Sequence, residues 1–553
     1  MKKRKNFLLV IPAIILIGLV FIGAGQRDSG SGSSGLPPAG GPHIGYTLPL
    51  APNGDTLRIF MGESTQPNIS YAREPIMPFW QKLQDDTGVR VIWELAPMAD
   101  HINIIQIRVA AGTDLPDISR LPPGMVMSWG NDGVLTPLNG LIDAYATNML
   151  NWWFTDNPTM RRRMTTPEGE IYALPQLFDL NDPSLGTNPV NTLVRKDWLD
   201  DMGMKEPTTL EEFHAMLVAF KSIDPYGDGK VNVIPFHPHY GGPNFRSHMT
   251  FFSIGWAYGL HLFTSGGYYP NANGVMECEF IGPRFRELLT TLNQWWNEGL
   301  IDPSFMNYDA QRTTALVSNQ EIGAYQNRMQ NPANNYNTAL KQLTGNPNAE
   351  YVPIVPLKGP YGDQFCENDF DPVGGLIWGI FNSSAKRELA MKWIDYAFFS
   401  PVMAEYNAYG IEGESFVWQD GVRVFTDKYV NHIDGLMNAL KQLGAQHQTE
   451  IIGTTLMANP EFIRPRSDLF SRFQMISPYI APFLALPLST MEEDEIINRY
   501  STDISTYADE MIIRFITGAT PLSQYDEYVA TLRRLGLDSI IAVQQSKYDR
   551  LSK

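Results

Sequence analysis

The hydrophobic pattern from residue 56 onward predicts strands and helices in alternation. Residues 56–61 and 89–95 alternate apolar with polar side chains and are rich in β-forming types, which indicates two strands. Between them, residues 76–83 carry apolar side chains at spacings of three and four, which indicates a helix, and Gly88 stands where a helix C-cap glycine belongs. A second helix over 102–111 and a third strand at 117–119 complete the order strand–helix–strand–helix–strand. This order predicts a parallel α/β sheet.

The same alternation returns in a second block after residue 190. Residues 191–195 predict a strand, and the capping box of Thr208–Glu212 predicts a helix that continues through Phe220. Residues 284–297 and 385–399 predict two more helices. Near the C-terminus one long amphipathic helix is expected from an apolar stripe made of Ile497, Tyr500, Ile504, Tyr507, Met511 and Phe515. The chain is therefore predicted to be an α/β protein with a helical C-terminal region.

The first 54 residues predict export and a tether. Residues 2–5 are basic, the following run is apolar, and it ends in small residues at 23–25, which is the order found in a secretory signal peptide. The run is also long enough to cross a bilayer uncleaved, so residues 1–25 are interpreted as a signal peptide or an N-terminal anchor. Residues 26–54 are rich in Gly, Ser and Pro and predict a flexible linker. The remainder is expected to lie outside the cytoplasm.

Size, charge and cysteine content limit the possible functions. The part after the linker exceeds what one hydrophobic core usually serves, so at least two lobes are expected. The net charge of −17 argues against nucleic acid and anionic lipid as partners, because both need a basic surface. Only Cys278 and Cys366 occur, so a disulfide framework is excluded. We interpret them as free buried thiols, with a single bridge as the alternative.

Six short motifs in register carry a resemblance to a known family. They are Asp114–Asp117, Tyr172–Pro175, Arg195–Asp200 with Glu206–Thr209, Asp224–Phe236, Tyr409–Gly413 and Gln544–Asp549. In this order and at these distances the chain resembles the family 1 extracellular solute-binding proteins of ABC sugar importers, in the large lipoprotein-type oligosaccharide-binding branch, which includes alginate-binding members. The resemblance covers nearly everything from about residue 55 to the end.

The resemblance implies a two-lobed fold of the periplasmic-binding-protein type II (Venus-flytrap), in which each lobe is a mostly parallel sheet flanked by helices. We expect residues 55–189 with about 372–412 to form lobe 1, and residues 190–371 with about 413–553 to form lobe 2. A carbohydrate, expected to be an oligosaccharide, would bind between the lobes, close the hinge and be delivered to ABC permease subunits in the membrane. No catalysis is expected, and we expect a monomer.

One feature departs from this branch. Its members usually carry a lipid-bearing cysteine at the end of the signal, whereas residues 21–24 read Phe-Ile-Gly-Ala and no cysteine precedes Cys278. We therefore expect a periplasmic or cell-surface protein that is either released after cleavage or held by its own apolar N-terminus. A cysteine-linked lipoprotein is not expected.

The segment 223–232 resembles an EF-hand calcium loop. Asp224, Asp228, the Lys230 carbonyl and Asn232 fall at positions one, five, seven and nine of such a loop. Tyr226 and Val233, however, stand where the family carries oxygen ligands. A structural Ca²⁺ is thus one interpretation, and a calcium-free turn that keeps the loop shape is the other. No cofactor is required for the expected function.

Aromatic and polar residues in the segments that line the cleft in this family are the candidate ligand contacts. Aromatic rings stack on the C–H faces of sugars, while planar polar groups bind their hydroxyls. The candidates are Glu63, Trp129, Gln176, Trp256, Tyr258, Tyr325 and Asn327. Ordinary packing is the alternative for each one. Trp80, Trp93, Trp198 and Trp393 lie in regular elements and are expected in the core.

The sequence gives little support for catalysis or for a histidine metal site. Glu367, Asp369 and Asp371 resemble a carboxylate pair for glycoside hydrolysis, but acidic residues in a polar loop are usually solvated. His237 and His239 alternate as in some metal sites, yet the segment is interpreted as a loop without a further ligand. The rival functions are a receptor that feeds a sensor or adhesion system and, less favoured, a glycoside-active enzyme.

Overall fold

The fold is described from a computed structural model. It describes residues 36–63, 71, 75–151, 158–174, 190–229, 232–238, 250–263, 265–306, 310–328, 336–367, 377–419, 422–430, 432, 436–445, 467–482, 484 and 486–551.

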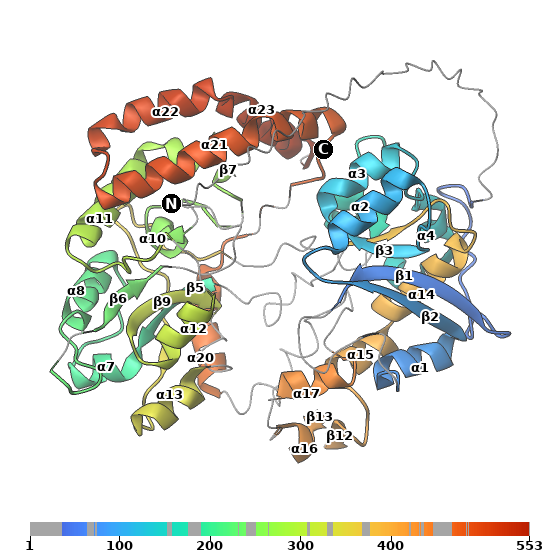
Figure 1. Cartoon of the computed structure of the whole chain (residues 1–553), viewed down its shortest axis with the longest axis horizontal. Helices are drawn as coiled ribbons and strands as arrows, with labels where there is room; N and C mark the ends of the chain where they lie inside the picture. Colours follow the sequence, from blue (N-terminus) through green and yellow to red (C-terminus); the bar gives the residue numbers. More distant parts are fainter. Residues whose placement is uncertain are drawn as a thin grey trace, which may run out of the picture. The chain divides into compact units, whose positions relative to one another are not determined.

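The first lobe is built on a sheet with the strand order β2-β1-β3-β11-β4, of which β1, β2 and β3 are labelled in Figure 1. β1 (Asp55–Gly62) pairs in parallel with β2 (Val89–Ala96) and β3 (Ile118–Leu121), whereas β11 (Ile377–Ile380) lies antiparallel to both β3 and β4 (Ala173–Leu174). The first three predicted strands are confirmed. The mostly parallel sheet is wrong: the sheet is mixed, because β11 enters it from far along the chain in the opposite direction.

Helices of the first lobe begin and end where local signals place them. α1 (Pro78–Thr87) ends at Gly88 with φ 69°, and α2 (His101–Ala111) ends at Gly112 with φ 64°, both in the left-handed region that favours glycine. Trp80 and Trp393 are buried, as expected. The remaining helices are α3 (Pro123–Asn131), α4 (Asn139–Tyr145), α5 (Thr147–Asn151), α6 (Pro158–Met164), α14 (Arg387–Phe399) and α15 (Pro401–Tyr409).

The second lobe has its own mixed sheet, with the strand order β10-β5-β9-β6. β5 (Val190–Arg195) is antiparallel to β9 (Ile322–Arg328) and β10 (Tyr351–Pro353), while β6 (Ile234–His237) and β9 run in parallel. Here too the prediction of a mostly parallel sheet is wrong. His237, expected in a loop, ends strand β6.

Helices and a hairpin surround this second sheet. The predicted capping box is confirmed, because Thr209 accepts from the Glu212 backbone N–H at the start of α8 (Leu210–Phe220). The other elements are α7 (Lys196–Asp201), α10 (Phe252–Ala257), β7 (Tyr268–Pro270), β8 (Met276–Cys278), η2 (Glu279–Ile281), α11 (Pro283–Asn297), α12 (Ala310–Ser318), α13 (Asn337–Thr344), α20 (Ser467–Ile476) and η5 (Ser477–Tyr479).

The C-terminal helices complete the core of the second lobe. The predicted long helix is α21 (Met491–Thr517), which is followed by η6 (Leu522–Gln524), α22 (Tyr525–Arg534) and α23 (Leu537–Leu551). α21 packs against α11 and α23 (Figure 1), and it buries Ile504, Ile512 and Phe515 in the main hydrophobic cluster. The predicted apolar stripe thus faces the core.

The predicted linker is partly wrong, because residues 37–54 belong to the compact unit Pro37–Lys553. The Tyr46 hydroxyl donates to Asp395 Oδ2 at 2.8 Å, and the backbone N–H groups of Ile44 and Gly45 both donate to the Ala144 carbonyl. Asp395 is fully buried and also accepts from the N–H of Met149 at 2.8 Å. Residues 37–54 are therefore held on the first lobe by hydrogen bonds, which their low apolar content does not reveal.

The predicted lobe boundary near residue 412 is also wrong. β12 (Phe416–Gln419), β13 (Val422–Phe425), α16 (Asp427–Val430) and α17 (Leu436–Gln442) share a small apolar cluster with Tyr409 of α15. The N–H of Phe79 in α1 donates to the Leu443 carbonyl. The first lobe therefore continues to about residue 445.

None of the described helices combines the length and apolar character of a membrane span.

Candidate functional site

The carboxyl ends of the parallel strands are where ligands bind in open α/β sheets. In the first lobe this edge lies after β1 and β2. Exposed Glu63 follows β1, and its backbone N–H donates to the Ala96 carbonyl at the end of β2 at 2.7 Å. A Cβ on the preceding Gly62 would lie 2.7 Å from Met98 Sδ and 3.0 Å from His101 Nδ1, so a side chain there would have to displace both. Glu63 is thus presented at the edge by a tightly packed turn.

Trp129 lies at the opposite edge of this sheet. It stands in the last turn of α3, and its ring centroid is 6.3 Å from that of Phe381, which follows β11. Because β11 is antiparallel to β3, with Ile380 opposite Ile118, Phe381 lies at the amino end of β3. The structure therefore does not bring Trp129 together with Glu63.

In the second lobe, Asn327 lies at the carboxyl end of β9. It is half-buried and pairs in register with Asn191 near the start of β5. The Asn191 side chain is buried; its Oδ1 accepts from the Thr192 N–H at 2.7 Å, but its Nδ2 has no hydrogen-bond partner among the described residues. An unpaired buried donor costs about 1–3 kcal/mol and calls for an explanation. Two asparagines thus lie opposite each other at this edge, and of the two only Asn327 is partly exposed.

Gln326, next to Asn327, holds together the chain segments that lie at that edge. Its Nε2 donates to the carbonyls of Pro238 and Thr250, and its Oε1 accepts from the N–H of Ser253 at 3.0 Å and from its hydroxyl at 2.6 Å. Gln326 is fully buried. Pro238 follows β6 and Thr250 precedes α10, so one amide fixes two chain segments at the carboxyl edge.

A buried aspartate holds the end of β6. Asp302 accepts from His237 Nδ1 at 2.8 Å and from Arg312 Nη1 at 2.9 Å, and His237 Nε2 lies 3.2 Å from Thr313 Oγ1. Although burial alone would raise the pKa of Asp302, the hydrogen bonds from His237 and Arg312 hold it well below its usual range. The described residues contain no group of three or more His, Cys, Asp or Glu side chains arranged to hold a metal. His239, the second histidine of the motif, lies outside the described residues.

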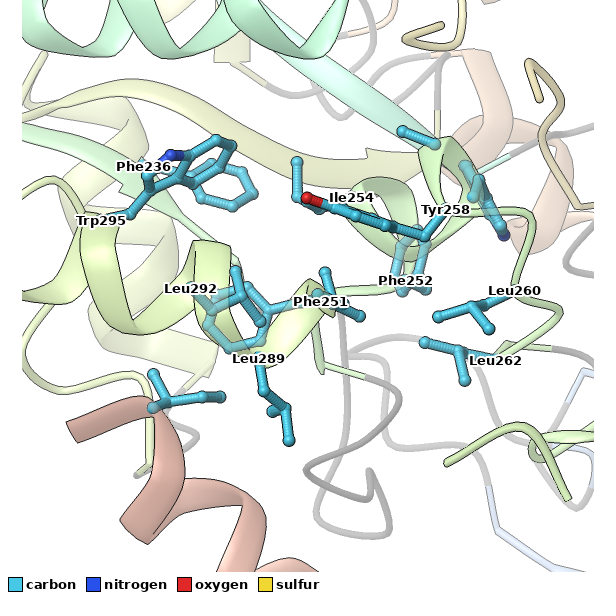
Figure 2. Close-up of a cluster of buried hydrophobic side chains, with 14 of the residues drawn as sticks. Phe236, Phe251, Phe252, Ile254, Tyr258, Leu260, Leu262, Leu289, Leu292 and Trp295 are labelled. Carbon is cyan, nitrogen blue, oxygen red and sulfur yellow. The ribbon is translucent and has the colours of Figure 1, made fainter. Parts of the chain in front are cut away.

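Three aromatic candidates are core side chains in this structure. Tyr258 is 5 % exposed and belongs to the apolar cluster of Figure 2, and Trp256 and Tyr325 are 1 % and 0 % exposed. Trp256 Nε1 donates to Glu367 at 2.8 Å, and the Tyr325 ring packs edge-on against Tyr351. A ring without an exposed face cannot stack on a sugar in this conformation. Glu63 and Asn327 remain as the predicted residues at the carboxyl edges.

The interpretation of Glu367 as a solvated loop residue is wrong, because its side chain is buried. Glu367 is buried and accepts from Trp256 and from the Phe263 N–H, so it has a structural role here, and Asp369 and Asp371 lie outside the described residues. Cys278 and Cys366 are free and buried, which confirms that prediction. Burial raises the pKa of both thiols, so neither is a reactive thiolate.

The residues of the 223–232 loop do not fit a calcium site. Ca²⁺ takes six to eight oxygen ligands, with a bidentate carboxylate at the twelfth position of an EF-hand loop. Here that position is Pro235, a buried residue of β6, and Tyr226 occupies the third. The two oxygens of Asp224 accept from the backbone N–H groups of Tyr226, Asp228 and Gly229. Asp228 and Asn232 are exposed, and Lys230 lies outside the described residues.

Sequence reasoning missed the buried polar residues of the second lobe. Gln326 and Asp302 lie in segments without a motif, and only tertiary contacts reveal their role. His237 gave a signal, since it alternates with apolar residues as a strand residue does, but its partner Asp302 is distant in sequence. Gln176, the remaining predicted contact, lies outside the described residues.

Comparisons with known proteins agree with this architecture. The family described as "bacterial extracellular solute-binding protein" matches residues 71–404. The fructooligosaccharide ABC transporter substrate-binding protein FusA of Streptococcus pneumoniae is 25% identical over 501 residues, which cover 85% of this chain and 86% of that protein. The lipoprotein LipO of Bacillus subtilis is 26% identical over 269 residues, 47% of this chain and 49% of its own.

Among solved structures, the alginate-binding protein AlgQ2, determined without calcium ion, has a TM-score of 0.70 at 22% identity; the alignment covers 91% of this chain and 100% of that one. A likeness of this kind supports the fold. The prediction of an α/β, two-lobed binding-protein fold with a helical C-terminal region is confirmed.

Proposed function

We propose, since this chain belongs to the bacterial extracellular solute-binding proteins, that it captures a neutral oligosaccharide and delivers it to an ABC transporter. Members of the family bind solutes and catalyse no reaction, so the enzyme rival is set aside. The observation that carries the proposal is the correspondence with FusA, which extends over 85% of this chain and is not confined to one lobe.

The carboxyl edges of the two sheets favour a ligand rich in hydroxyl groups. Glu63 offers a carboxylate acceptor in the first lobe, and the half-buried Asn327 offers an amide group in the second. Sugar hydroxyls both donate and accept, so they pair with either kind of group.

A neutral ligand is favoured over an acidic one such as alginate. The net charge is −17, and Glu63 at the predicted edge adds a negative charge where a polyanion would have to bind. Such a field disfavours an anionic partner unless a local basic cluster offsets it. The expected affinity is about micromolar or tighter, on the order of −8 to −10 kcal/mol. The protein is proposed to act as a monomer with the permease as its partner.

A thermal-shift screen tests this function. Neutral fructose-containing oligosaccharides are expected to raise the melting temperature of the exported chain, because a ligand that binds only the folded state stabilises it. Alginate oligosaccharides and short peptides serve as the comparison. A shift with peptides and none with any saccharide would overturn the sugar assignment; turnover of the saccharide would restore the enzyme rival.

Attachment to the cell is proposed to rely on residues 1–25 and not on a lipid-linked cysteine. The relative LipO is a lipoprotein by name, but the printed sequence has no cysteine before Cys278. Mass spectrometry of protein recovered from the cell surface is expected to show an unlipidated chain. A diacylglycerol adduct would contradict this proposal and leave the ligand assignment untouched.

A further inference from the structure

Between α8 and β6, the loop residues 224–229 form a turn that is closed by hydrogen bonds from its own backbone. Asp224 Oδ1 accepts from the N–H groups of Tyr226 at 3.2 Å and Asp228 at 3.3 Å, and Oδ2 accepts from the N–H of Gly229 at 2.6 Å. Gly227 and Gly229 have φ of 66° and 84°, a region that favours glycine. The bond from Gly229 is the main reason why the pKa of Asp224 is lowered. The Asp224 carboxylate thus organises the turn over residues 224–229.

Tyr226 attaches this loop to a second one. Its hydroxyl lies 2.7 Å from the Asn319 carbonyl and 3.1 Å from Glu321 Oε1, in the turn between α12 and β9. Burial, followed by the nearby Glu321 charge, raises the pKa of Tyr226, so the hydroxyl keeps its proton at neutral pH and donates it. Glu321 also binds the other end of the loop, because its carbonyl accepts from the Ile234 N–H at 2.8 Å.

These contacts lie at the amino edge of the parallel pair β6 and β9. The loop and the turn enter two neighbouring strands, with Ile234 opposite Ile322. In an EF-hand loop, a bound cation would hold the chain at the same entry into β6 by binding oxygen ligands inside the loop. Here the third position of the loop is the tyrosine, and its hydroxyl binds the neighbouring turn outside the loop. The side chain that replaces a ligand therefore supplies a contact of its own.

We propose that Tyr226, together with Asp224, fixes the entry into β6 in place of a calcium ion, so that the second lobe folds and binds without calcium. The inference is independent of which solute is bound, because the loop lies at the edge of the sheet opposite the predicted ligand edge.

Hydrogen exchange of the full chain, followed by mass spectrometry of peptides covering 221–238, tests the proposal. Exchange and melting temperature are expected to be the same in millimolar calcium and in EDTA. Tyr226→Phe is expected to speed exchange in these peptides and to lower the melting temperature by about 1–3 °C, the effect of losing one hydrogen bond.

Tyr361→Phe is the matched control. Tyr361 is 48% exposed against 47% for Tyr226, and its hydroxyl binds Glu287 at 2.6 Å, away from the loop. This variant is expected to leave exchange in 221–238 unchanged. Added protection or a higher melting temperature of the wild-type chain in calcium would overturn the proposal. Equal exchange in Tyr226→Phe and the wild type would also overturn it.

Discussion

The two edges of the second sheet are each organised by one aspartate, but in different surroundings. At the amino edge, the oxygens of Asp224 bind backbone N–H groups of a loop whose neighbouring residues are mostly exposed. At the carboxyl edge, Asp302 is fully buried and binds His237 and Arg312. Hydrogen bonds lower the pKa of both carboxyls, against burial in the case of Asp302.

The two arrangements differ in how much stability is lost when one hydrogen-bond partner is removed. Water replaces a lost partner at an exposed loop, so the loss there is small. A buried group such as Asp302 is shielded from water, so the loss of its hydrogen bonds costs more. The more rigid arrangement stands at the edge where a ligand is proposed to bind, as a site that must hold its geometry requires.

The largest effect is expected from Asp302→Ala. Removing this carboxylate deletes the buried hydrogen bonds that Asp302 accepts from His237 and Arg312, which is expected to lower the free energy of unfolding by about 3–5 kcal/mol. Urea unfolding measures it. Asp201→Ala, at an exposed aspartate of α7, is the control and is expected to change stability by less than about 0.5 kcal/mol.

The stability difference between the wild type and Asp302→Ala is also expected to depend on pH. A carboxyl whose pKa is lowered by folding stabilises the protein above its unfolded pKa of about 3.9, and the contribution is lost as the pH falls through the folded pKa. The stability difference between wild type and Asp302→Ala should therefore stay constant at neutral pH and narrow below about pH 4. A difference that grew on acidification would contradict the assigned direction of the shift.

An intermediate effect is expected from Gln326→Leu. Leucine keeps much of the volume but leaves the carbonyls of Pro238 and Thr250 and the Ser253 hydroxyl to find other partners, at a cost of about 2 kcal/mol. Gln364→Leu is the matched control, because Gln364 is only partly buried and makes one bond, from Nε2 to the Pro356 carbonyl at 2.8 Å. Equal losses in the two variants would show that Gln326 has no special role at the edge.

The smallest effect is that of Tyr226→Phe at the amino edge, on the order of 0.5–1.5 kcal/mol. This variant is informative because its effect is expected to be smaller than those of Gln326→Leu and Asp302→Ala. If this variant were as damaging as Asp302→Ala, the contrast between an exposed and a buried edge would be wrong.

The sequence predicted the elements well and their long-range assembly poorly. β1, α1, β2, α2 and β3 follow from local periodicity and from the two C-cap glycines, Gly88 and Gly112. The mixed sheets could not be predicted in this way, since the direction of β11 depends on a segment far along the chain. The attachment of residues 37–54 depends on single hydrogen bonds such as that of Tyr46 to Asp395, which composition does not show.

The candidate site was predicted only in part, for a related reason. Trp256 and Tyr325 have the composition of a sugar-stacking residue, but the same rings serve equally well in a core, and tertiary packing decides between the two. Glu63 was placed correctly after the first strand because strand boundaries are local features, whereas Asn327, expected after its strand, lies within β9 close to its end. Their role as ligand contacts stays a prediction.

Isothermal titration calorimetry of a neutral fructooligosaccharide such as kestose into the full chain tests directly whether the protein captures neutral oligosaccharides. We expect saturable binding at about micromolar Kd or tighter. Asn327→Ala is expected to weaken binding about tenfold, because one polar contact is lost, and Trp129→Ala, at the opposite edge of its sheet, is expected to leave the affinity unchanged. The absence of binding by any neutral oligosaccharide, together with binding of an acidic one, would contradict it.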